Sequence, residues 1–309
     1  MRALVVGLGV QGAKRRRVAG VDVVATVDPA RAEADYRAVE DVPDGSYDAA
    51  LVCVPDSAKL AILAHFAARG KHALVEKPLL AKDEKDLLRL EELAREHDAV
   101  VYTAYNHRFE PHFVRMRETI AAGRLGALYL ARFFYGNGTA REVRGSPWRD
   151  REGGVLTDLG SHLIDTALDW FGAPAQPFRI ETAHRFENRA FDHVRFAAAG
   201  RPALEMEATL VSWRNHLSID VYGELGSAHV ESLCKWGPAT FRVRTRVLPS
   251  GRPPEEALTL VQEDPTWELE YAHFQRLCRE RAVTDLAKDV WIHRSLGRLC
   301  AEALERFPE

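Results

Sequence analysis

The sequence predicts an α/β protein with an N-terminal doubly wound Rossmann domain and a C-terminal α/β domain built on a large open, mainly antiparallel sheet. In the first third, short apolar runs alternate with stretches of helical spacing, a rhythm that favours a parallel sheet of βαβ units. Beyond about position 123, longer runs rich in Val, Phe, Tyr and Thr follow one another with glycine turns between them. Because 309 residues exceed one usual core, we expect domains at 1–120 and 121–309.

The strands of the first domain are expected where apolar and β-branched residues cluster between turns. Two intervening segments, 57–70 and 83–99, have the apolar spacing of helices. Crossover connections between parallel strands are right-handed, so these elements predict a doubly wound sheet. The expected strands cover residues 2–7, 21–28, 48–54, 71–76 and 99–105.

The second domain is expected to contain consecutive strands, followed by a helical tail from 267 to 307. Few helices are expected after position 175, yet the strands carry many Phe, Val and Leu residues. Such a sheet cannot leave both faces in water, so we expect sheet-to-sheet packing in a homodimer or homotetramer. The expected strands cover residues 127–136, 178–186, 203–213, 217–224, 226–233 and 241–248.

Composition describes a soluble globular chain, with 46% hydrophobic and 28% charged residues. A formal charge of -3 gives no basic footprint for nucleic acid. The cysteines are scattered without a CxxC pair, which indicates neither a disulfide framework nor a zinc site, and no metal is expected. The N-terminus has no signal-peptide pattern and no apolar run approaches membrane length. We therefore expect a cytoplasmic protein without a membrane or nucleic-acid partner.

A dinucleotide-binding turn is predicted directly after the first strand. Gly7, Gly9 and Gly12 form G-x-G-x-x-G where a strand passes into a helix. Glycine permits the tight turn and lets backbone N–H groups approach a pyrophosphate, whose charge a helix N-terminus favours. Val10 and Gln11 complete the predicted contact segment. The basic run at 14–17 is expected to be only a solvated helix face.

Asp28 bears on the choice of cofactor. It ends the second strand 21 residues after Gly7, where a carboxylate accepts hydrogen bonds from the adenosine ribose and repels a 2′-phosphate. NAD is therefore predicted, with NADP still possible because Arg31 could turn toward a phosphate. Val54 and Pro55, after the third strand, are further predicted cofactor contacts.

The segment "LVEKPLL" places Glu76, Lys77 and Pro78 directly after the fourth strand. Ligands of open α/β sheets bind beyond the carboxyl ends of the strands. Glu76 and Lys77 are therefore predicted to contact the cofactor, although the sequence alone also allows an exposed loop pair.

The segment "GGVLTDLGSHLIDTALDWF" places Asp158 and His162 four residues apart, so a helix would bring both to one face. Asp165 and Asp169 continue the same polar stripe. From this stretch alone, the pattern favours the solvated face of an amphipathic helix over a reactive pair.

The chain as a whole resembles the glucose-fructose oxidoreductase, inositol dehydrogenase and rhizopine-catabolism family, shortened to Gfo/Idh/MocA. The resemblance rests on G-x-G-x-x-G, "CVP", E-K-P, "YNHRF" and G-G-x-x-x-D-x-G-x-H in this order. It implies a Rossmann domain joined to a domain with a large open sheet. Lys77 corresponds to the family's active-site lysine, Asp158 to its acid and His162 to its general acid/base. The chain departs from the family with Asp56 and Lys59, where Asn and His are frequent.

The implied reaction is oxidation of a secondary alcohol, or reduction of the ketone, on a sugar, sugar nucleotide or cyclitol. His162 would accept the hydroxyl proton while hydride passes to the nicotinamide. Lys77 would stabilise the developing alkoxide, and Asp158 would orient the lysine or histidine.

Substrate contacts are predicted where polar and aromatic residues follow the last Rossmann strand and precede the reactive helix. Amide, guanidinium and flat aromatic groups suit a hydroxyl-rich ring, with or without a phosphate or carboxylate. Two other functions remain open: a glycosidase that oxidises its sugar transiently, and a non-catalytic cofactor-sensing protein. The predicted substrate contacts are Tyr105, Asn106, Arg108, Trp148, Arg149, Asp158 and His162.

Overall fold

The computed structural model describes residues 1–146, 149–151 and 153–308. By its internal contacts, the chain divides into one unit of 1–106 with 266–294, and a second unit of 107–265 with 295–309. The helical tail is thus shared between both units. This grouping differs from the division predicted at residue 120. Whether 1–120 and 121–309 fold independently stays a prediction.

The first unit contains the predicted parallel sheet, in the order β2-β1-β3-β4-β5. Every pairing in it is parallel, with Val5 of β1 opposite Leu51 of β3 and Thr26 of β2. The five strands lie close to their predicted positions. Their bounds are β1 Ala3–Val6, β2 Val23–Val27, β3 Ala49–Val52, β4 His72–Glu76 and β5 Val101–Ala104.

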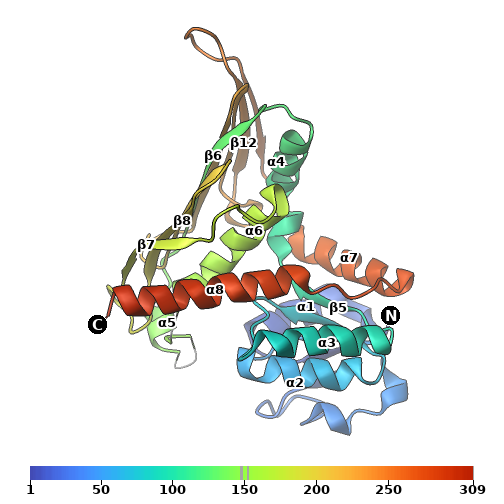
Figure 1. Cartoon of the computed structure of the whole chain (residues 1–309). Helices are drawn as coiled ribbons and strands as arrows, with labels where there is room; N and C mark the ends of the chain where they lie inside the picture. The colour runs from blue at the N-terminus through green and yellow to red at the C-terminus, as the bar shows by residue number, and fades with distance from the viewer. Residues whose placement is uncertain (147–148, 152, 309) are drawn as a thin grey trace. The chain divides into compact units, whose positions relative to one another are not determined.

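Apolar side chains cover both faces of this sheet, which explains why its strands read as continuous apolar runs. One core joins Val5 and Leu74 to Phe274 of the returning C-terminal segment. The opposite core joins Leu4 to Phe66 and Leu87, and α2 and α3 lie next to each other in Figure 1. The helices of this unit are α1 Val10–Ala19, α2 Asp56–Ala67, α3 Glu84–Glu96 and α7 Thr266–Glu280; α8, Ala287–Arg306, begins in it.

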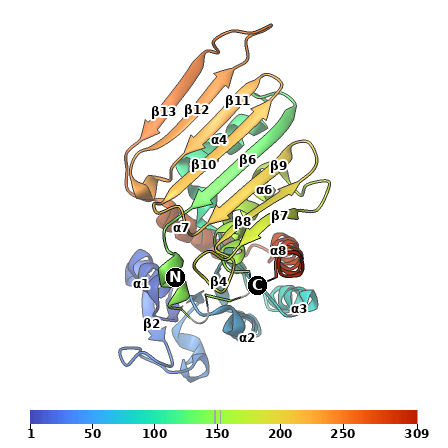
Figure 2. The same cartoon turned by 90° about the vertical axis from the view of Figure 1, so that its left-hand side faces the viewer.

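The second unit contains a mainly antiparallel sheet in the order β13-β12-β11-β10-β6-β9-β8-β7 (Figure 2). The pairing of β6 with β9 is parallel, and the other pairings are antiparallel. Its strands are β6 Leu128–Gly136, β7 Arg179–His184, β8 His193–Ala198, β9 Ala203–Thr209, β10 His216–Gly223, β11 Gly226–Glu231, β12 Ala239–Thr245 and β13 Glu255–Leu260.

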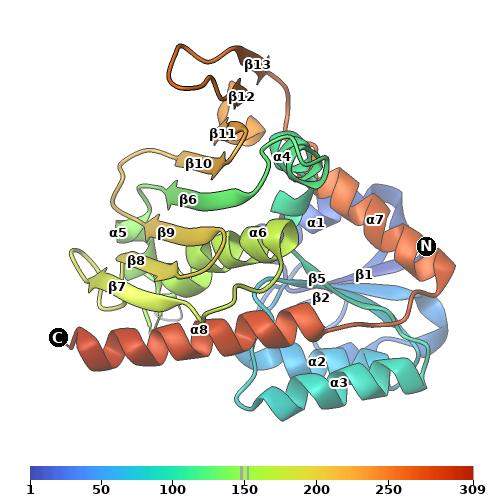
Figure 3. The ribbon, with the colours of Figure 1, turned by 45° about the horizontal axis from the view of Figure 1, so that its top comes forward.

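The two faces of this sheet differ in chemistry. Helices pack on the apolar face (Figure 3): α4, Pro111–Ala121, contacts β11 and β12, and the segment leading into α6, Ser161–Phe171, contacts β9. A short helix, α5, spans Ala140–Arg144. The other face is polar and carries ion pairs such as Arg132 with Glu205. The predicted sheet-to-sheet packing in a homodimer or homotetramer stays a prediction.

Within the described ranges, no helix has the length and apolar character needed to cross a bilayer.

Candidate active site

The glycine turn after β1 has the geometry that a dinucleotide site requires. A Cβ on Gly12 would lie 1.8 Å from the carbonyl oxygen of Gly7, so only glycine allows the helix to approach the strand end this closely. A Cβ on Gly9 would meet nothing within 4 Å. The backbone at Gly9 is thus open to a ligand, while Gly12 fixes the turn. Val10 and Gln11 are exposed at the start of α1.

Asp28 follows β2, and backbone donors hold its carboxylate. Its Oδ2 accepts a hydrogen bond from the Leu8 N–H at 2.8 Å, and Oδ1 accepts from Ala30 and Arg31. Burial opposes ionisation, but these hydrogen bonds and the Arg31 charge lower the pKa of Asp28 below its ordinary value. A fixed negative charge therefore follows the second strand.

The other predicted cofactor residues also follow or end Rossmann strands. Val54 and Pro55 follow β3, Glu76 ends β4, and Lys77 follows it directly. Because carboxyl ends of parallel strands lie at one edge of a sheet, Gly7, Asp28 and Lys77 share that edge. This arrangement fits a dinucleotide. The individual cofactor contacts stay predictions.

Arg15, which was expected on a solvated helix face, is buried. It is 1% exposed and donates at 2.7 Å to both Glu76 and Glu270. The guanidinium also lies 4.2 Å from the ring centroid of Trp267. The prediction failed because the partners come from β4 and α7, which no local pattern on α1 reveals. Glu76 is therefore held by Arg15.

Lys59, the residue at which the chain departs from the family pattern, is also buried. Its Nζ lies 2.6 Å from Asp56 Oδ1 and 2.8 Å from the carbonyl oxygen of Pro78. Lys59 of α2 thus donates a hydrogen bond to the E-K-P segment at Pro78, the residue after Lys77. Sequence reasoning gave it no role, although its position one turn after Asp56 is an ion-pair spacing.

The D-x-G-x-H segment is a π-helical turn, Leu156–Gly160, that runs into α6. Single π-helical turns occur frequently at functional sites. Gly154 enters the turn at φ 47°, and a Cβ there would lie 2.3 Å from the Phe191 carbonyl oxygen. Gly154 is therefore required by packing against the β7–β8 connection, whereas a Cβ on Gly153 would lie 2.4 Å from Cys300 Sγ of α8. Asp158 lies on the π-turn and His162 in the first turn of α6.

The solvated-face interpretation of this helix was wrong. His162 is 8% exposed and Asp165 only 1%, and Arg108 pairs with Asp165 through Nε at 3.1 Å. Arg117 pairs with Asp169 at 3.0 Å. Cations from the segment around α4 thus pair with Asp165 and Asp169, whose side chains are 1% and 15% exposed.

The two predicted reactive groups of the second unit each have an identified neighbour. Arg149 Nη2 lies 3.1 Å from Asp158 Oδ2. The His162 ring stacks on His107 with 4.0 Å between centroids and 19° between planes. These contacts restrict the orientation of both side chains.

The remaining predicted substrate residues are divided between the units. Tyr105 is 1% exposed, and Asn106 donates to Thr266 Oγ1 at 2.8 Å; both belong to the first unit. Arg108 and Arg149 belong to the second. Trp148 lies outside the described residues. All of these substrate contacts stay predictions.

Family models match both halves of the chain. Residues 1–105 match the model described as "Oxidoreductase family, NAD-binding Rossmann fold", and residues 113–229 match "GFO/IDH/MocA C-terminal domain". The chain belongs to the Gfo/Idh/MocA oxidoreductase family. Its N-terminal unit is the NAD-binding Rossmann domain of that family. The open backbone at Gly9 and the Asp28 carboxylate suit binding of a dinucleotide.

Curated relatives in this Gfo/Idh/MocA family match parts of the chain. Inositol 2-dehydrogenase of Rhizobium meliloti is 25% identical over 221 residues, 68% of this chain and 61% of the relative. The scyllo-inositol 2-dehydrogenase (NADP(+)) IolW of Bacillus subtilis is 35% identical over 108 residues, 34% of this chain and 29% of the relative. The chain thus spans less than two thirds of either relative's length.

Solved structures share the fold along nearly the whole chain. A levoglucosan dehydrogenase in complex with NADH and levoglucosan has a TM-score of 0.82 at 17% identity, covering 99% of this chain and 97% of the other. At this identity the likeness establishes the fold and leaves the activity to be argued from the residues.

Proposed function

We propose that the protein is an NAD-dependent dehydrogenase that oxidises a secondary alcohol of a sugar, sugar nucleotide or cyclitol, or reduces the corresponding ketone. The observation that carries this proposal is the position of the His162 imidazole, which stacks on His107 and lies one turn after Asp158. An imidazole has a reference pKa near 6.5, which suits transfer of a hydroxyl proton near neutral pH.

The residues have separate roles in this reaction. His162 accepts the hydroxyl proton, and the Lys77 ammonium stabilises the negative charge that develops on the oxygen. Asp158 orients Lys77 or His162. Arg149 in turn binds the Asp158 carboxylate at 3.1 Å. The bound nicotinamide supplies the hydride acceptor. Lys77 belongs to the first unit and Asp158 and His162 to the second, so their joint action is part of the proposal.

NAD is the proposed cofactor, with NADP as the alternative. The fixed Asp28 carboxylate supports NAD, since it repels a 2′-phosphate. The named relative that uses NADP(+) shows that both cofactors occur among the chain's relatives. We also propose a carbohydrate-like small molecule as substrate, a homodimer or homotetramer, and a cytoplasmic location.

The test is a substrate screen followed by substitution. NADH absorbance is monitored with neutral and acidic sugars, sugar nucleotides and cyclitols, and an active compound is then used with variants. His162→Ala is expected to lower turnover by ~10²-fold or more, with cofactor affinity unchanged; Lys77→Ala should do likewise. His184→Ala, an exposed histidine of β7, is the matched control.

Each alternative has its own outcome in this test. Product that forms without accumulating NADH would contradict the dehydrogenase and support a glycosidase with transient oxidation. Cofactor binding with no turnover of any compound would favour a cofactor-sensing protein. Near wild-type turnover of His162→Ala would refute the assigned mechanism.

A further inference from the structure

We propose that Ser227 is a nucleophile that accepts an acyl group from a small ester, with His229 as its general base and Asp220 as the carboxylate that orients His229. This second activity goes beyond the proposed dehydrogenase and needs no nicotinamide. All three residues lie in the second unit, on the polar face of its eight-stranded sheet. None of them belongs to the site predicted from the sequence.

Strand pairing brings the three side chains to one face of the sheet. Asp220 of β10 lies directly opposite His229 of β11, and Ser227 lies two residues before His229. Successive side chains of a strand point to opposite faces, and Ala228, between them, is 0% exposed in the core. Ser227 and His229 therefore share the polar face, where both are half-buried and solvent reaches them.

Hydrogen bonds connect the three side chains in the order that nucleophilic catalysis requires. Ser227 Oγ lies 2.8 Å from His229 Nε2, and His229 Nδ1 lies 2.5 Å from Asp220 Oδ1. Because a carboxylate only accepts hydrogen bonds, Nδ1 carries the ring proton, and Nε2 is the acceptor for the Ser227 hydroxyl. The serine, histidine and carboxylate thus have the connectivity of acyl-transfer enzymes, in which the histidine takes the hydroxyl proton.

Arg244 of β12 supplies a cation beside the nucleophile. It lies directly opposite Ser227, and its Nε donates to Glu255 at 2.7 Å. Its Nη1 lies 3.4 Å from His229 Nε2, the nitrogen that Ser227 also approaches. The substrate oxygen that becomes negative during acyl transfer would therefore form next to a guanidinium donor. A Cβ on Gly226 would lie 2.2 Å from the Arg244 carbonyl oxygen, so glycine permits this close approach of the strands.

The proposed reaction needs only the ester and water. Ser227 Oγ forms a bond to the acyl carbon as the ester C–O bond breaks, and His229 transfers the hydroxyl proton to the leaving alcohol. Water then attacks the acyl carbon, and His229 transfers a proton from that water to Ser227 Oγ. The carboxylic acid leaves and the free serine is restored.

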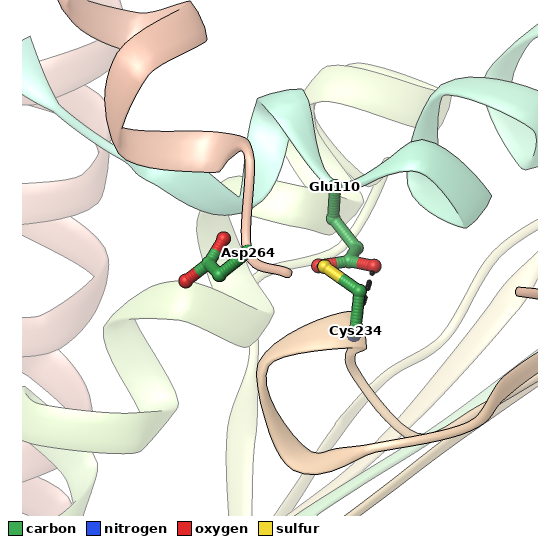
Figure 4. A group of neighbouring side chains, drawn as sticks. All are labelled: Glu110, Cys234 and Asp264. Atoms are coloured by element: carbon green, nitrogen blue, oxygen red, sulfur yellow. Dashed lines mark hydrogen bonds between the residues drawn. The ribbon is translucent and has the colours of Figure 1, made fainter. Parts of the chain in front are cut away.

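Cys234, a buried thiol of the same unit, does not offer this chemistry. Figure 4 shows it beside the Glu110 carboxylate, with Asp264 nearby. Cys234 is 2% exposed and its thiol donates to Glu110 at 3.1 Å, and burial raises the pKa of the thiol. Because only the thiolate is a strong nucleophile, Cys234 stays protonated and enclosed, whereas Ser227 has a base beside it.

The test treats the full chain, without cofactor, with para-nitrophenyl acetate and with a fluorophosphonate probe. Absorbance follows release of nitrophenolate, and mass spectrometry of peptides locates the acetyl or phosphonyl group. We expect the wild-type protein to carry the group on Ser227 and to release nitrophenolate ~10²-fold faster than Ser227→Ala or His229→Gln. Asp220→Asn should lower the rate by ~10-fold or more, because it removes the charge that favours the imidazolium.

Ser218→Ala is the matched control, since Ser218 lies on the same face of β10 but opposite Glu231 instead of a histidine. It should keep the wild-type rate and labelling. The proposed sheet-to-sheet packing would cover this face, so the reactions are run over a dilution series with light scattering alongside. Labelling of Ser218 in place of Ser227, no labelled serine at any concentration, or equal rates for wild type and Ser227→Ala would overturn the proposal. Because no nicotinamide is present, these outcomes leave the proposed dehydrogenase to its own test.

Discussion

The Nζ atom of Lys59 lies 2.8 Å from the carbonyl oxygen of Pro78, and its side chain is 2% exposed. A buried ammonium therefore supports the segment that begins with Lys77. Desolvation lowers the pKa of Lys59, whereas Asp56 opposes that shift. Lys59, at which the sequence departs from the family pattern, thus contacts the E-K-P segment.

We predict that Lys59→Met lowers kcat by ~10-fold with little change in NAD affinity, because the Pro78 carbonyl loses its donor while the cofactor turn after β1 is untouched. Steady-state kinetics on a substrate from the screen and NAD titration by fluorescence provide the measurements. Lys59→Arg keeps a donor and should recover part of kcat. Equal kcat for Lys59→Met and the exposed Lys85→Met would contradict this role.

Arg15→Met is predicted to destabilise the protein by about 3–5 kcal/mol, since it leaves Glu270, 0% exposed, without its cation. Urea unfolding followed by circular dichroism measures the free energy of unfolding. Arg16→Met on the same helix removes an exposed charge and should change it by less than about 0.5 kcal/mol. If Arg15→Met and Arg16→Met lower the free energy of unfolding by similar amounts, Arg15 is not the cation that stabilises Glu270.

Asp28 is predicted to set cofactor preference. The wild-type protein should bind NAD more tightly than NADP, and Asp28→Ser should narrow that ratio by ~10-fold or more, since a hydroxyl no longer repels a 2′-phosphate. Fluorescence titration of both reduced cofactors gives the ratio. Asp35→Ser, which removes a carboxylate bound to Thr26, serves as control. An unchanged ratio in Asp28→Ser would assign the preference to another residue.

The stability of the fold is predicted to fall as pH drops below 6.5. Burial lowers the pKa of His72 from 6.5, and its Nδ1 accepts a hydrogen bond from the Val100 N–H at 3.0 Å. Because the folded pKa lies below the unfolded one, the unfolded chain binds more protons between the two values, so unfolding becomes more favourable as pH falls through this window.

Urea unfolding between about pH 5 and pH 7 measures this dependence. His72→Gln keeps an acceptor without titrating and should flatten the pH profile relative to wild type. The exposed His97→Gln should keep the wild-type slope. A His72→Gln profile as steep as the wild-type profile would assign the dependence to other histidines whose pKa values burial lowers, such as His112 and His193.

The sequence by itself determined the five strands of the Rossmann sheet and the order of the motifs, but it did not predict β8 and β13 of the second sheet. Short apolar runs predicted the five parallel strands because β1, β3 and β4 are buried on both faces. The spacing of Gly7, Gly9 and Gly12 predicted the turn because its geometry depends on residues close in sequence. Helical spacing also depends only on residues close in sequence, so Asp158 and His162 could be predicted to lie one turn apart on a helix.

Only the tertiary structure decided which charges are buried and what faces them. Arg15 looks like its exposed neighbours on α1 until Glu76 and Glu270 arrive from positions 61 and 255 residues away. Asp165 is buried because Arg108 pairs with it. Burial of a charge depends on partners distant in the chain, and periodicity reports only which local face is apolar.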